Sequence, residues 1–73
     1  MTTKVGKFGL MLKSERLKRS LSQEALAELS GLSRNYISSI ERGAVSPSLK
    51  TLEKLAKALG ISLTKLIGKY EGA

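Results

Sequence analysis

Residues 22–43 of this 73-residue chain read SQEALAELSGLSRNYISSIERG and carry its clearest structural pattern. Ser22 and Ser33 each precede a segment with helical spacing of apolar residues, where a serine hydroxyl can cap the free amides of a helix start. Gly31 lies between the two segments, and glycine readily takes the left-handed conformation that ends many helices. The stretch therefore predicts two short helices joined by a tight turn, the second of them starting near Arg34.

These two helices are expected to cross at a steep angle, because only about three to four residues connect them. A steep crossing needs a small residue where the backbones approach, and Ala27 occupies that place. It also needs apolar residues that face inward from both helices. The spacing supplies Leu26, Leu32, Ile37 and Ile40. The second helix is expected to run to about Arg42, with Gly43 closing it.

Helical spacing of apolar residues continues on both sides of this pair. The preceding helix, of about three turns, ends around Arg19 and carries Phe8, Met11, Leu12 and Leu17. A loop over residues 44–48 leads to a fourth helix, which Ser48 caps, Gly60 stops and the stripe Leu49, Leu52, Leu55, Ala56 and Leu59 runs along. Ser62 caps a fifth short segment that carries Leu63, Leu66 and Ile67 and is interrupted by Gly68. The sequence thus predicts one compact all-α domain of five helices over residues 1–73, with residues 1–6 and 69–73 frayed.

The charge balance points to a polyanionic partner. Thirteen Lys and Arg against six Asp and Glu give a net charge of +7 and a pI near 10.1. Such an excess on a small domain favours nucleic acid or an anionic membrane surface, while a purely solubilising role is the plainer alternative.

The absent residue types exclude several kinds of chemistry. The chain contains no cysteine and no histidine, so it has no disulfide, no thiolate zinc site and no Ser/His or Cys/His nucleophile pair. We therefore expect no enzymatic activity, no metal, no cofactor and no small-molecule ligand. The start Met-Thr-Thr-Lys-Val-Gly lacks the apolar run of a signal peptide, and no stretch is long enough to span a membrane. A cytoplasmic location is the resulting expectation.

From residue 22 to residue 43 the sequence resembles the Cro and phage-repressor type of helix-turn-helix domain, an XRE-like family with the lambda-repressor fold. Pro47-Ser48-Leu49 and the stripe from Leu52 to Ile61 extend the similarity, so that about sixty residues, 8–67, fit the family. Within the family, the run Arg34-Asn35-Tyr36-Ile37-Ser38 is similar to that of restriction–modification controller proteins.

The resemblance implies a transcriptional regulator that binds specific double-stranded DNA through the helix that starts near Arg34. The implied base-reading residues are Arg34, Asn35, Tyr36, Ser38 and Ser39. The chemistry agrees, because arginine can donate two hydrogen bonds to guanine and asparagine can pair with adenine in the major groove. Tyr36 lies off the face of Ile37 and Ile40, so we expect it to contact DNA rather than to be buried.

Other residues are expected to position the protein on the phosphate backbone, which sets register without reading sequence. They are Ser22, Gln23, Arg42, Ser46 and Lys50, of which Lys50 is equally well read as an ordinary solvated lysine.

The resemblance also implies a structural ion pair between Arg16 and Glu41. Three positions depart from the family pattern: Glu15 replaces an apolar residue, Ser20 a glycine and Lys65 a capping-box glutamate. Because Glu15 is charged, the sequence does not predict how the first helix packs at this position.

One such domain covers about half of a DNA site, so we expect a homodimer on a pseudo-palindromic operator. By analogy with family members, the candidate interface is Leu63, Leu66, Ile67 and Tyr70, although Leu63 and Ile67 would also suit the edge of the monomer core. RNA polymerase is a further candidate partner.

Two other functions are alternatives to a DNA-binding regulator. The first is an antitoxin or adaptor module whose main partner is a protein, and the second is a basic element that binds membranes. The second is disfavoured because the first helix is needed for the core.

Overall fold

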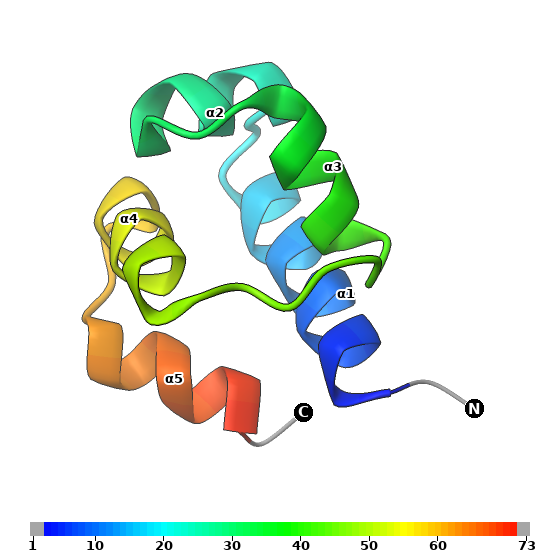
Figure 1. Ribbon diagram of the computed structural model, residues 1–73. Coiled ribbons are helices and arrows are strands. Elements are labelled where there is room, and N and C mark those ends of the chain that lie inside the picture. The colour runs from blue at the N-terminus through cyan, green and yellow to red at the C-terminus, as the bar shows by residue number, and fades with distance from the viewer. Residues whose placement is uncertain (1–2, 72–73) are drawn as a thin grey trace.

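The computed structural model describes residues 3–71, and side chains within it as far as residue 69. Over this range the chain forms five α-helices and no strand. They are α1 (Lys4–Lys18), α2 (Gln23–Ser30), α3 (Arg34–Glu41), α4 (Leu49–Leu59) and α5 (Leu63–Glu71). Figure 1 shows α2 and α3 joined by a tight turn at one end of the molecule, with α5 at the opposite end and α1 and α4 between them. The predicted all-α fold of five helices is confirmed.

Hydroxyl caps define where the helices begin. The four predicted caps are present, and Thr3 adds a fifth in front of α1. In each case the hydroxyl accepts a hydrogen bond from the amide three residues on: 3.0 Å at Thr3, 2.9 Å at Ser22, 3.0 Å at Ser33, 3.1 Å at Ser48 and 3.1 Å at Ser62. Each bond satisfies a donor that a helix start leaves without an intrahelical partner.

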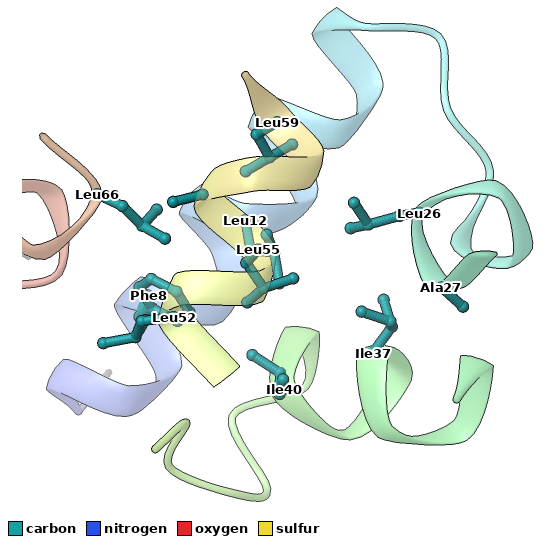
Figure 2. Close-up of a cluster of buried hydrophobic side chains, with 11 residues drawn as sticks. Phe8, Leu12, Leu26, Ala27, Ile37, Ile40, Leu52, Leu55, Leu59 and Leu66 are labelled. Atoms are coloured by element: carbon teal, nitrogen blue, oxygen red, sulfur yellow. The ribbon is translucent and has the colours of Figure 1, made fainter. Parts of the chain in front are cut away.

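The core collects side chains from all five helices, as Figure 2 shows. Its fully buried side chains are Phe8, Leu12, Leu26, Ile37, Ile40, Leu55 and Leu66. Two predicted core residues are wrong: Leu17 and Leu49 are 56% and 59% exposed. Both have helical spacing from true core residues, but each lies at an end of its helix, where the face turns away from the neighbouring elements.

A close backbone contact fixes α1 against α3. A Cβ atom on Gly9 would lie 2.3 Å from the carbonyl oxygen of Ile40, so only glycine lets the two helices approach this far. Gly43 follows α3 with φ of 74°, and a Cβ there would lie 2.8 Å from Cα of Gly6. The end of α3 is therefore held directly on the first half of α1.

The limits of the outer helices differ from the prediction. Residues 1–6 were expected to be frayed, but α1 begins at Lys4, because Thr3 supplies a cap. At the other end, α5 continues through Gly68 to Glu71, whereas an interruption at Gly68 and fraying from Lys69 were expected. Among residues 3–71, no helix combines the length and the apolar character needed to cross a membrane.

Candidate DNA-binding surface

The contact between α2 and α3 orients the exposed side of α3. Leu26 and Ala27 of α2 are buried together with Ile37 and Ile40 of α3, as predicted. Gly31 takes φ of 72° between the helices, and its amide bonds to the carbonyl of Ala27. With the two isoleucines fixed in the core, the opposite side of α3 must face solvent.

The exposed side of α3 carries most of the predicted base-reading residues. Arg34 and Asn35, the first two residues of the helix, are exposed, while Ser38 and Ser39 one turn later are half-buried. Asn35 has an exposed amide side chain, and its backbone carbonyl accepts a hydrogen bond of 3.0 Å from Ser39 Oγ. The structure thus brings an arginine, an asparagine and two serines onto one short helical surface.

Arg34 forms an ion pair that the sequence did not reveal. Its Nε lies 3.2 Å from Oε2 of Glu24 in the first turn of α2, and the two side chains are 54% and 69% exposed. The sequence gives no sign of this pair, because residues ten apart on two different helices show no periodic signal. The pair forms only because the turn at Gly31 brings the two helix starts together.

Arg42 lies along the same surface rather than apart from it. Its Nη1 donates to Ser38 Oγ over 2.7 Å, and its Nη2 lies 3.4 Å from Ser39 Oγ. Arg42 is exposed, so the guanidinium remains open to solvent while it bridges the two hydroxyls. The residue predicted to contact phosphate therefore adjoins the residues predicted to read bases.

Tyr36 departs from the prediction. It is half-buried, packs against the core, and its hydroxyl lies 3.0 Å from Thr51 Oγ1 of α4. Thr51 is itself buried and bonded to Ser48, so the tyrosine ring is tied to the start of α4. The ring is less exposed than expected because its hydroxyl contacts Thr51, and helical spacing alone does not place α4. Contact of Tyr36 with DNA stays a prediction.

Arg16 and Glu41 form the predicted ion pair. Arg16 Nε donates to Glu41 Oε2 over 2.7 Å and Nη2 to Oε1 over 3.0 Å, with only 8% and 4% of the side chains exposed. These hydrogen bonds raise the pKa of Arg16 above its ordinary value. Gln23 adds a third contact, because its side-chain amide donates to Glu41 Oε1 over 3.1 Å. The first residue of α2 is thereby anchored to α1 and α3 through one carboxylate.

The remaining predicted phosphate contacts border the surface. Ser22 is exposed, and although its Oγ accepts the capping bond, its hydroxyl hydrogen is not used by that bond. Ser46 in the loop after α3 and Lys50 in the first turn of α4 are both exposed. Gln23 precedes α3 along the chain, whereas Arg42, Ser46 and Lys50 follow it.

The predicted dimer interface on α5 needs a correction. Leu66 is fully buried in the core, so it has no surface to offer a second chain. Leu63 and Ile67 are half-buried and pack against the core edge. The side chain of Tyr70 lies outside the described residues. Helical spacing grouped these residues on one face but did not separate the part that contacts α1 and α4 from the part that is left open.

The chain is similar in sequence and fold to known helix-turn-helix proteins. A family model described as helix-turn-helix matches residues 12–66. The immunity repressor of Bacillus phage phi105 is 46% identical over 61 residues, which are 84% of this chain and 42% of that protein. Control protein C.SmaI of Serratia marcescens is 52% identical over 56 residues, which are 77% of this chain and 67% of that protein. The crystal structure of the restriction-modification controller protein C.AhdI from Aeromonas hydrophila is 47% identical, with a TM-score of 0.81, and the match covers 85% of this chain and 94% of that one.

The chain spans less than half the length of the phage repressor, so that similarity concerns one part of a longer protein. The residues matched by the family model include the whole of α2, α3 and α4, which contain nearly all of the surface described above. By the family match, the sequence identities and the fold, the chain belongs to the helix-turn-helix family of the Cro and phage-repressor type.

Proposed function

We propose that this chain binds a specific duplex DNA sequence through the exposed side of α3 and regulates transcription. One observation carries the proposal: Ile37 and Ile40 are fully buried, while Arg34 and Asn35 at the start of the same helix are exposed. A helix that enters the major groove presents its first residues to the base edges. The side chains at this end of α3 are the types that pair with guanine and adenine.

Affinity in this proposal comes from the phosphate backbone. The net charge of +7 attracts DNA at long range, and the exposed Arg42 and Lys50 lie on the C-terminal side of α3 along the chain. Gln23 lies on the other side, where the start of α2 directs backbone amides outward. The Gln23 amide group has two hydrogens, so one can bond a phosphate oxygen while the other holds Glu41.

The regulator acts as a homodimer on a pseudo-palindromic operator. The helix α3 has eight residues and is about 12 Å long, which is enough to read only a few base pairs. A second copy supplies the other half of the site, and the half-buried Leu63 and Ile67 of α5 are the proposed contact between the copies. The relatives include a phage immunity repressor and a restriction–modification control protein, which support this class of regulator.

Selection of bound sequences from a random duplex library tests the proposal. We expect a pseudo-palindromic consensus, and we expect Arg34→Ala to lose about 1–3 kcal/mol of discrimination at one base pair per half-site. The variant should melt like the wild type, because Arg34 is exposed. Lys57→Ala is the matched control, since it removes an exposed cation from the far end of α4 and should leave the consensus unchanged. An unaltered consensus for Arg34→Ala would contradict the proposed reading helix.

A further inference from the structure

The ion pair between Glu24 and Arg34 joins the starts of two helices. Glu24 is the second residue of α2 and Arg34 the first residue of α3, and the tight turn shown in Figure 1 brings them together. Oε2 of Glu24 lies 3.2 Å from Nε of Arg34, and both side chains remain more than half exposed. The contact therefore lies on the surface that is proposed to face DNA.

The atoms involved decide what the pair can do. A guanidinium has one N–H on Nε and two on each Nη, arranged in a flat fork. The closest approach of Glu24 Oε2 is to Nε, on the side of the fork, whereas Nη1 and Nη2 lie at its tip. Guanine presents two acceptors, O6 and N7, that match two parallel N–H groups. A carboxylate beside Nε does not need the end-on pair of donors, so Nη1 and Nη2 can pair with a guanine.

We infer that Glu24 is a positioning residue that orients Arg34 for a bidentate contact with guanine. The inference rests on the proposed function and adds a specificity determinant to it. A long arginine side chain loses rotamer freedom when it binds, and a contact that restricts it beforehand lowers that cost. The same carboxylate repels phosphates, so it weakens binding to every duplex alike. Glu24 therefore increases discrimination at the expense of general affinity.

Two simpler roles make different predictions. A carboxylate in the first turn of a helix also stabilises the helix start, and that role affects the melting temperature but not the choice of base pair. A carboxylate that only competes with guanine for Arg34 would weaken binding to the selected duplex most, so its removal would raise discrimination. Discrimination between two duplexes that differ at one base pair separates both of these roles from positioning.

The test compares Glu24→Ala, Glu24→Gln and Glu28→Ala. Glu28 is exposed on the same helix one turn later, so its variant matches the charge loss without the contact to Arg34. For each protein, Kd is measured for the selected duplex and for the same duplex altered at the base pair that Arg34→Ala identifies. Discrimination is the Kd for the altered duplex divided by the Kd for the selected duplex. We expect Glu24→Ala to lower this ratio about two- to five-fold, which corresponds to the free energy of an exposed ion pair. Glu24→Gln keeps an acceptor oxygen and should fall between Glu24→Ala and the wild type.

A second comparison isolates the coupling. In an Arg34→Ala background, Glu24→Ala should leave the ratio unchanged, because the side chain that it orients is absent. The inference is overturned if Glu24→Ala retains the wild-type ratio, or if Glu28→Ala lowers the ratio as much. These results would leave the proposed function standing. Failure of the wild-type chain to select any duplex would instead refute the proposed function, and this inference with it.

Discussion

Ser20 adopts a backbone conformation that favours glycine. Its φ of 56° is the one positive value at a non-glycine position among residues 3–71. The left-handed region costs an L-residue roughly 1–2 kcal/mol in the folded chain. Glycine avoids this cost, but its greater freedom in the unfolded chain lowers stability by about 0.4–1 kcal/mol. Ser20→Gly should therefore raise the free energy of unfolding by about 0.5–1 kcal/mol, measured by urea denaturation. Ser14→Gly, the same change inside α1, should lower it, and a loss of stability for both variants would contradict the strain at Ser20.

Single residues were predictable where the cause is local. Serine caps depend on the next three residues, and all four predicted from the sequence form. The half-burial of Tyr36 was not predicted, because its surroundings depend on where α4 lies. The ion pair between Glu24 and Arg34 was missed for the same reason: it depends on the angle between two helices. The sequence thus predicted which residues form the candidate surface, but not the contacts that these residues make with one another.

At the scale of helices, glycine explains the largest difference from the prediction. Gly6 and Gly9 have poor helix propensity, and residues 1–6 were expected to be frayed. In the folded chain both are helical, and at Gly9 the contact with the end of α3 leaves no room for a Cβ atom. Tertiary contact therefore outweighs local preference here. Sequence spacing predicted the number and order of the helices, but not the first three residues of α1 or the passage of α5 through Gly68.

The join between α1 and α5 depends on the buried carboxylate of Glu15. Arg19 and Lys18 donate hydrogen bonds to it, and Lys69 of α5 lies 3.9 Å away. The bonds from Arg19 and then Lys18 hold the pKa of Glu15 below its ordinary value of 4.5. A lowered pKa stabilises the fold above pH 4.5, and this contribution is lost as the pH falls through the folded value. Glu15→Gln should therefore destabilise the chain at pH 7, with a difference from wild type that shrinks in acid. Equilibrium urea unfolding at pH 7 and at an acidic pH below 4.5 measures this difference. Glu53→Gln, a change at an exposed residue, serves as the control.

For the whole molecule, the fold separates two surfaces. Figure 1 places α2 and α3 at one end and α5 at the other, so a chain bound to DNA through α3 keeps α5 open to a second copy. The molecule measures 30 × 23 × 22 Å. Recognition helices of such dimers lie about 34–36 Å apart, one turn of the duplex. Two molecules of this size placed side by side can span that distance without a linker.

Dimerisation through α5 gives the last prediction. The wild-type chain should sediment at twice its mass of 7.9 kDa, and Ile67→Glu should sediment as a monomer because it places a charge in the proposed contact. The variant should bind a palindromic duplex no better than two separate half-sites. Leu29→Glu adds the same charge to an exposed position of α2 and should remain dimeric.

Ile67 also packs against the core, so circular dichroism must show that the Ile67→Glu variant is folded. Leu63→Glu provides a second test on the same helix. A wild-type chain that remains monomeric while it binds the palindrome would refute the dimer, because cooperative recognition requires contact between the two copies.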